Sequence, residues 1–415
     1  MSERDNWSSK AADHASAARH AVKWLPLSMA IGVPAGLASA ALLYVLNVVT
    51  RQRLETPRLL YLLPFGGAAV GWLYQRFGKD SHRGHDLLIE QIHEPGAGVP
   101  RRMAPFVFGG TIVTHLFGGS AGREGTAVQM GGSLASAVAR ALGLDAEGTR
   151  IALMSGVAAG FSSVFGTPLA GTMFALEVLS IGIMRYDALF PCLGAAVVAD
   201  LVCRGTGIHH EVYVVAASSD PWLLPKAAVA GALFGLAGQL FAELTHAVQK
   251  GCARLSRSGA VRPMIGGVAV IALTLLCGSR DYLGLGVDVI NASFHPGGAS
   301  WFAWAWKTVF TAVTAGSGFV GGEVTPLFFI GSTLGHSLAR LMSAPVDLFA
   351  ALGLVAVFGG AANTPLACVL MGAELFGAAH LVPLAVACFT SYLFSGHSGI
   401  YHSQRLGVRK GEAKR

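Results

Sequence analysis

The sequence predicts an all-α membrane protein that crosses the bilayer many times and consists of two related halves. Of its 415 residues, 53% are hydrophobic and only 13% are charged, about half the charged fraction of a typical soluble domain. A helix needs about 20 apolar residues to span a bilayer. Uncharged stretches near this length recur at Trp24–Thr50, Leu59–Gln75, Ile151–Leu176, Leu348–Ala373 and Leu375–Gln404. Their apolar residues are continuous rather than alternating, which favours helices over membrane strands.

A duplicated motif predicts the two halves. Residues 165–177 align with residues 362–374: both segments contain Thr-Pro-Leu-Ala and end on a glutamate, at an offset of 197 residues. A second pair of glutamates, Glu124 and Glu323, is offset by 199 residues. Each follows a glycine-rich stretch and precedes a long apolar run. Two blocks in one order at nearly one spacing indicate an internal duplication.

The basic residues predict how the halves are oriented. Positive charge concentrates on the cytoplasmic side of membrane proteins. Basic residues flank the first span and follow the last: Lys10, Arg19 and Lys23, then Arg405, Arg409, Lys410, Lys414 and Arg415. We therefore expect both termini in the cytoplasm of a multi-pass protein of the cell (inner or plasma) membrane. The loop from Gly205 to Pro221 contains no Lys or Arg and is predicted to be external. Halves that begin on opposite sides form an inverted repeat.

These features predict the domain boundaries. We expect a cytoplasmic N-terminal segment at 1–20, a first repeat half at 21–205, an external linker at 206–220, a second half at 221–404 and a basic cytoplasmic tail at 405–415.

The two glutamates mark helix starts that suit an anion. Threonine follows each glutamate closely, at Thr126 and Thr325, and threonine is a good helix-capping residue. The glycines before them permit irregular backbone, which membranes tolerate only where it lines protein or a watery cavity. Helices that begin there direct unpaired N–H groups and about half a positive charge each at the cavity. The alternative is that the glycines only allow close helix packing.

Glu124 adds a proton to this arrangement. As a carboxylate it can occupy the anion site itself, and once protonated it is neutral and can leave. One side chain would then compete with the anion and carry a proton, which is a minimal exchange device. The alternative is that Glu124 pairs with Arg123 or caps a helix.

These motifs resemble the CLC chloride channel/transporter family, and within it the fluoride/proton antiporter branch (CLC-F). Residues 122–126, Gly-Arg-Glu-Gly-Thr, resemble the family's GREGP motif, with the threonine of the fluoride branch in place of proline. Residues 322–326, Gly-Glu-Val-Thr-Pro, resemble the GxFxP motif as that branch carries it. Residues 395–404 resemble the C-terminal segment that places a pore tyrosine. The resemblance covers nearly the whole chain.

The resemblance implies a fold and a role for each matching residue. The fold would be an inverted repeat of tilted and half-membrane helices that forms a homodimer with one pore per subunit. Glu124 would be the external gating glutamate that carries the proton, and Tyr401 would direct its hydroxyl at the anion. The backbone N–H groups of Gly125, Thr126, Val324 and Thr325 would bind the anion. Glu323 would be the carboxylate of the fluoride branch, with a role in proton handling or in structure.

Two positions depart from the chloride members of the family. Their serine-bearing segment corresponds to residues 84–88 here, and His85 stands in place of the serine. This histidine could donate a hydrogen bond to fluoride, or it could be an ordinary loop residue beside Arg83 and Asp86. The internal proton-transfer glutamate of chloride exchangers should follow Glu177, where this chain has Val178. That absence fits the fluoride branch.

The predicted function is export of fluoride from the cytoplasm, driven by proton influx. Fluoride enters acidic surroundings as neutral HF and is trapped inside as an ion, so such an exporter protects the cell. The alternative is a chloride/proton exchanger or a passive anion channel of the same fold. A membrane enzyme that uses Glu124 and Glu323 as an acid/base pair is disfavoured, because no nucleophile or metal set accompanies them. We expect fluoride, protons, the lipid bilayer and a second subunit as partners, and no cofactor, metal, nucleotide or nucleic acid.

Overall fold

Sixteen α-helices make up most of the computed structural model, which describes residues 3–218 and 220–411. The first eight are α1 (Glu3–Glu55), α2 (Leu63–Phe77), α3 (Gly84–His93), α4 (Met103–Leu116), α5 (Glu124–Ala141), α6 (Ala146–Phe165), α7 (Pro168–Glu177) and α8 (Leu189–Gly205). The others are α9 (Leu223–Leu255), α10 (Val261–Cys277), α11 (Val287–Ala292), α12 (Ala303–Gly316), α13 (Val324–Met342), α14 (Val346–Ala362), α15 (Pro365–Phe376) and α16 (Leu381–Phe394).

Short elements connect these helices. Four 3₁₀ helices span Pro57–Leu62, Lys79–Arg83, Tyr186–Ala188 and Ala378–His380. Strands β1 (Ser180–Ile181) and β2 (Arg405–Leu406) form a parallel pair that ties the end of the chain to the first half. Of the basic residues behind the predicted orientation, the side chains of Lys10 and Arg19 and all of Lys414 and Arg415 lie outside the described residues.

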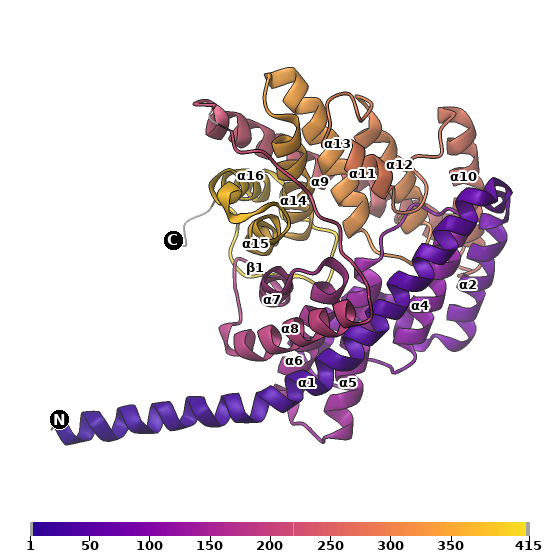
Figure 1. Cartoon of the computed structure of the whole chain (residues 1–415). Helices are drawn as coiled ribbons and strands as arrows, with labels where there is room; N and C mark the ends of the chain where they lie inside the picture. Colours follow the sequence, from indigo (N-terminus) through magenta and orange to yellow (C-terminus); the bar gives the residue numbers. More distant parts are fainter. Residues whose placement is uncertain (1–2, 219, 412–415) are drawn as a thin grey trace.

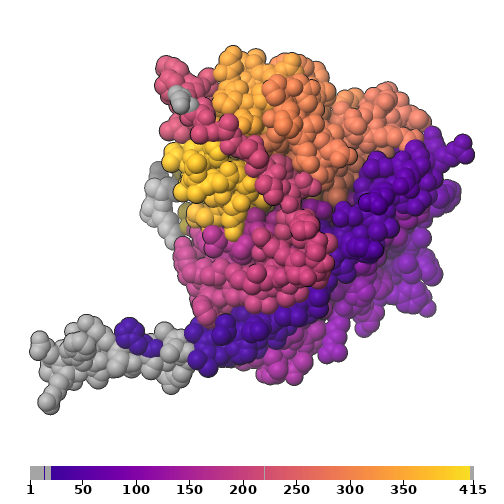
Figure 2. All heavy atoms as spheres, viewed as in Figure 1, coloured from indigo at the N-terminus to yellow at the C-terminus, as the bar shows by residue number. Residues whose placement is uncertain are grey.

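The second eight helices repeat the order of the first eight. Helices α4, α5 and α6 begin 200 residues before α12, α13 and α14. In Figure 1 the first set occupies the lower and right parts of the molecule and the second set the upper part, and the segment between α8 and α9 crosses both. Figure 2 shows the two sets meeting along one broad boundary on the face in view. The predicted all-α inverted repeat is confirmed, while its boundaries at 21–205 and 221–404 stay a prediction.

Few of the described helices are long enough to cross a membrane without interruption. Three are both long and apolar enough, at His20–Glu55, Tyr186–Gly205 and Leu223–Leu255. Two of the predicted uncharged stretches are instead broken near their middle, after Gly166 and Asn363, whose φ angles are 74° and 57°. A Thr-Pro pair follows each break, and proline begins the next helix because it has no N–H to lose at that position. The breaks produce the half-length helices α7 and α15.

A pair of glutamates locks α7 and α15 together. The Glu177 carboxylate, at the end of α7, accepts hydrogen bonds from the backbone N–H groups of Leu366 (3.1 Å) and Ala367 (2.9 Å) in the first turn of α15. Glu374 in α15 accepts the equivalent bonds from Leu169 (3.0 Å) and Ala170 (2.9 Å) in α7. Each repeat therefore caps a helix of the other, which gives the two glutamates a structural role.

The start of α5 meets the start of α13 at the centre of the molecule. Gly122 and Gly322 exchange two backbone hydrogen bonds, with N–H···O distances of 2.6 and 2.8 Å. Behind this bridge, α5 crosses α6 at Gly131 and Gly156, and α13 crosses α14 at Gly331 and Gly353. A Cβ on Gly131 or Gly331 would lie 2.2 or 2.0 Å from the carbonyl oxygen of the facing glycine. Close helix packing at glycine and the central helix starts therefore both occur in this structure, so the two explanations for the glycines do not exclude each other.

The crossing of α13 and α14 gives a test of this packing. We expect Gly331→Ala to lower the stability of the protein by about 1–3 kcal/mol, because the new methyl group forces two buried helices apart. The measurement is the temperature at which half of the detergent-solubilised protein still elutes as a single species.

Gly109→Ala in α4 is the matched control, because a Cβ there meets no atom within 4 Å. It should leave the transition temperature unchanged or raise it slightly, since alanine favours helix. Equal transition temperatures for Gly331→Ala and Gly109→Ala would contradict the close crossing.

Candidate functional site

Glu124 is buried at the junction between the two repeats. It is the first residue of α5, and 1% of its surface is exposed. Its carboxylate accepts hydrogen bonds from the Thr325 hydroxyl at 2.6 Å and from the Thr325 backbone N–H at 3.1 Å. Thr325 lies in the first turn of α13, whose unpaired N–H groups and positive dipole end favour a negative charge. The carboxylate of one repeat thus binds where the helix start of the other could bind an anion.

Arg123 contributes less to this contact than its position suggests. Its backbone N–H donates to the Glu124 carboxylate at 3.1 Å, but its Nε lies 3.6 Å from that carboxylate and makes no hydrogen bond. The alternative that Glu124 mainly pairs with Arg123 is therefore weaker than the helix-capping alternative. The observed geometry makes Glu124 a cap of α13.

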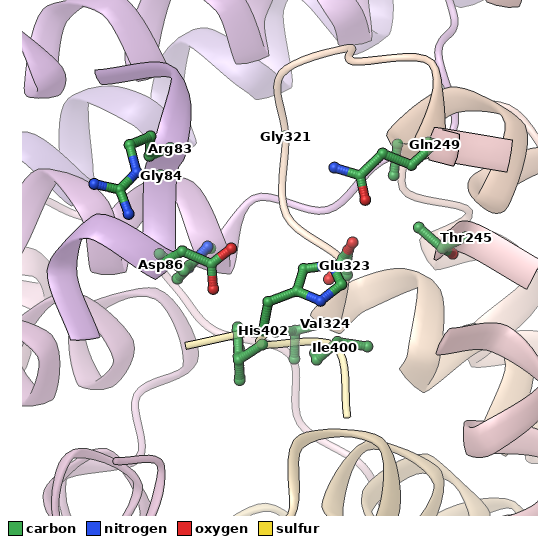
Figure 3. Close-up of a pocket in the computed structure, with 15 residues that line it drawn as sticks. Arg83, Gly84, Asp86, Thr245, Gln249, Gly321, Glu323, Val324, Ile400 and His402 are labelled. Carbon is green, nitrogen blue, oxygen red and sulfur yellow. The ribbon is translucent and has the colours of Figure 1, made fainter. Parts of the chain in front are cut away.

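A cavity of about 180 Å³ lies next to this contact, on the side where residues 400–402 of the C-terminal segment pass. Five of the predicted site residues line it: His85, Gly125, Glu323, Val324 and Tyr401. They come from α3, α5, the start of α13 and the C-terminal segment, so the cavity collects residues from both repeats. Figure 3 shows Asp86, Glu323 and His402 around its centre, with Thr245 and Gln249 on the side of α9.

Glu323 differs from Glu124 in its contacts. It directly precedes α13 and lines the 180 Å³ cavity. No described residue forms a hydrogen bond or ion pair with its carboxylate, whereas Glu124 has several donors. The two repeats thus place one glutamate in a bonded, sealed position and the other in an open one.

The C-terminal segment holds Tyr401 in place. The Ile400 N–H donates to the Ala361 carbonyl at 2.9 Å, and the Ser403 N–H donates to the Asp86 carboxylate at 2.9 Å. Gln404 donates to the carbonyls of Val178 (3.0 Å) and Ala362 (3.1 Å). These bonds fix the backbone on both sides of Tyr401. Its ring centroid lies 5.3 Å from that of His85.

A second, smaller cavity of about 40 Å³ lies on the other side of Glu124. Glu124 and Thr325 line it, together with His210, Glu211 and Tyr213 from the segment between α8 and α9. Gly125 and Val324, which are the chain neighbours of Glu124 and Thr325, line the first cavity of about 180 Å³ instead. The bonded Glu124 carboxylate therefore lies between two cavities. Residues of the C-terminal segment line one, and residues of the segment between α8 and α9 line the other.

Thr126 is the predicted residue that lines neither of these two cavities. Its hydroxyl forms a hydrogen bond of 2.6 Å with Thr111 of α4 instead. Sequence reasoning also missed Gln129, whose amide Nε2 lies 3.2 Å from His85 Nδ1. Gln129 follows Gly125 by four residues, so helical periodicity places both on one face of α5. That spacing could have identified Gln129.

Comparison with known proteins places this architecture in a family. The family model described as voltage gated chloride channel matches residues 66–396. The chloride/fluoride channel protein of Pseudomonas syringae pv. tomato is 49% identical over 397 residues, which cover 94% of this chain and 87% of that protein. The H(+)/Cl(-) exchange transporter ClcA of Vibrio vulnificus is 26% identical over 408 residues, covering 87% of this chain and 84% of that protein.

Solved structures agree with this assignment. The crystal structure of a CLC-type fluoride/proton antiporter superposes with a TM-score of 0.90 at 37% identity, covering 93% of this chain and 98% of that one. A slow cyanobacterial Cl-/H+ antiporter superposes with a TM-score of 0.77 at 20% identity, covering 89% and 93%, and so shows the shared fold. The chain belongs to the CLC family of voltage-gated chloride channels and transporters.

Proposed function

We propose that this protein is a fluoride/proton antiporter that exports fluoride in exchange for protons. The observation that carries the proposal is the Glu124 carboxylate bound to the hydroxyl and N–H of Thr325. It is a protonatable group that occupies an anion-binding helix start. The 49% identical chloride/fluoride channel protein and the 37% identical fluoride/proton antiporter support the same function.

The exchange follows from competition for this helix start. A deprotonated Glu124 neutralises the positive end of α13 and fills the place of an anion. When Glu124 takes up a proton, it loses most of its attraction to that end, and an anion can bind there. The anion and the proton then move through one position in alternation, so their opposite movements are coupled.

Glu323 is proposed to handle protons on the side of the 180 Å³ cavity. A structural carboxylate in a membrane protein normally has hydrogen-bond donors or a cation beside it. Glu323 has neither among the described residues, while it lines the cavity together with Tyr401. This favours proton handling over the structural role left open by the sequence. Val178 occupies the position where chloride exchangers carry their own internal glutamate.

The orientation of the protein and its assembly are further parts of the proposal. The cavity beside the C-terminal segment would open to the cytoplasm and the cavity beside residues 206–220 to the outside, with both termini inside the cell. The protein would act as a homodimer in the cell membrane. His85, Gly125, Val324 and Tyr401 would line the inner anion path, and Thr325 the position that Glu124 shares with the anion.

Anion selectivity is the first test. Purified protein in liposomes should release fluoride at least about tenfold faster than chloride, because a small, strongly hydrated ion needs well-directed donors to replace its water. Ion-selective electrodes measure both rates. An inward proton gradient should also drive fluoride uphill.

A chloride rate equal to the fluoride rate would favour the alternative of a chloride/proton exchanger. Fluoride that never moves against its gradient would favour a passive channel.

The role of Glu124 can be tested separately. Glu124→Gln should reduce proton transport at least about a hundredfold while fluoride still crosses, because glutamine has the shape of glutamate but releases no proton. Proton uptake and fluoride release are recorded in the same liposomes.

Glu243→Gln is the control, since Glu243 lies on the exposed surface of α9. It should leave both rates unchanged. Undiminished proton transport by Glu124→Gln would refute the gating role.

Glu323→Gln distinguishes proton handling from structure. We expect the detergent-solubilised variant to elute as a single species up to the same transition temperature as the wild type, because no described residue is hydrogen-bonded to Glu323. Its coupled proton flux should fall at least about tenfold. An unfolded or aggregated variant would instead indicate a structural role.

A further inference from the structure

We infer that Gln129 is a positioning residue that fixes the tautomer of His85, so that His85 presents an N–H group to the transported anion. The inference rests on the proposed anion transport. It concerns two side chains: Gln129 on α5 and His85 at the start of α3. Neither the repeat nor the helix starts account for the contact between them.

The contact itself determines the tautomer. Gln129 Nε2 lies 3.2 Å from His85 Nδ1. An amide nitrogen only donates, so Nδ1 must accept, and a neutral imidazole then carries its proton on Nε2. A proton on Nδ1 would point at the hydrogens of the amide. Gly84 leaves room for the contact, because a Cβ there would lie 3.2–3.4 Å from the Gln129 amide.

The other ring nitrogen of His85, Nε2, lies against the backbone of Gly125. Nε2 is buried and makes no hydrogen bond to a described residue. The ring packs against Gly125, where a Cβ would lie 3.2 Å from Nε2 and 2.7 Å from the adjacent ring carbon. A buried donor without an acceptor is unfavourable, so such groups in proteins nearly always have a ligand or a function.

The 180 Å³ cavity beside His85 supplies the missing acceptor when an anion enters. His85 lines it with Gly125, Glu323 and Tyr401. The charged groups around the same cavity are Arg83, Asp86 and Glu323, and Tyr401 and His402 are its other titratable groups. Fluoride accepts hydrogen bonds far more strongly than chloride, so an oriented N–H favours fluoride. The opposite tautomer would turn a lone pair toward the anion and repel it.

The proposed tautomer predicts the direction in which one substitution changes the selectivity for fluoride. In Gln129→Glu, the new carboxylate accepts from Nδ1–H and moves the proton of the neutral ring away from Nε2. At pH 8 the fluoride-to-chloride ratio of passive efflux should then fall about tenfold, the effect of one lost hydrogen bond. The wild-type ratio at the same pH is the reference.

Gln129→Met removes the donor but supplies no acceptor. Both tautomers of the neutral ring are then available, so the ratio at pH 8 should lie between those of wild type and Gln129→Glu. A ratio equal to that of wild type would show that Gln129 does not fix the tautomer, and a ratio as low as that of Gln129→Glu would make the effect one of packing; either result would overturn the inference.

A spectroscopic readout separates this inference from the proposed function. The protein labelled with ¹⁵N-histidine reports which ring nitrogen of His85 carries the proton, and His85→Gln identifies the signal by its loss. We expect Nε2–H in the wild type and Nδ1–H in Gln129→Glu at pH 8. Nδ1–H in the wild type would overturn the inference, even in a protein that transports fluoride. Nε2–H in a protein that transports no fluoride would support the role of Gln129 and contradict the proposed function.

Discussion

The contact between the Glu124 carboxylate and the first turn of α13 is the interaction on which the rest of the structure depends. It requires two helices from different repeats to begin face to face inside the protein. The Gly122–Gly322 bridge holds the two starts together, and the glycine crossings at Gly131 and Gly331 let each helix approach its neighbour. The reciprocal caps of Glu177 and Glu374 fasten the repeats at a second place.

The two glutamates at equivalent repeat positions have different contacts, although the scaffold around them is repeated. Duplication gives Glu124 and Glu323 the same place at a helix start, but Thr325 binds only the carboxylate of Glu124. Among the described residues Glu323 has no hydrogen-bond partner, and it lines the cavity of about 180 Å³. The proposed exchange of two ions needs one protonatable group that blocks the path and one that remains accessible. The different contacts of Glu124 and Glu323 are consistent with these two roles.

The duplicated motifs were enough to predict the helical inverted repeat, and three of their residues, Gly125, Glu323 and Val324, line the 180 Å³ cavity. The fold prediction succeeded because it depended on local sequence: glycine before glutamate, threonine after it, and proline at a helix start. Two features were beyond local sequence. The hydroxyl of Thr126 bonds to Thr111, and the Gln129 amide contacts the His85 ring, because of how α4, α5 and α3 pack. The path of residues 400–404 likewise depends on bonds to distant carbonyls.

The most direct test of the account is the number of protons taken up when fluoride binds. If fluoride displaces the Glu124 carboxylate from the start of α13, binding must be linked to protonation of that side chain. Isothermal titration of the detergent-solubilised protein, in two buffers of different ionisation enthalpy at one pH, measures this number. We expect an uptake of about one proton per fluoride, which disappears in Glu124→Gln. Fluoride binding without proton uptake by the wild type would contradict the proposed exchange at Glu124.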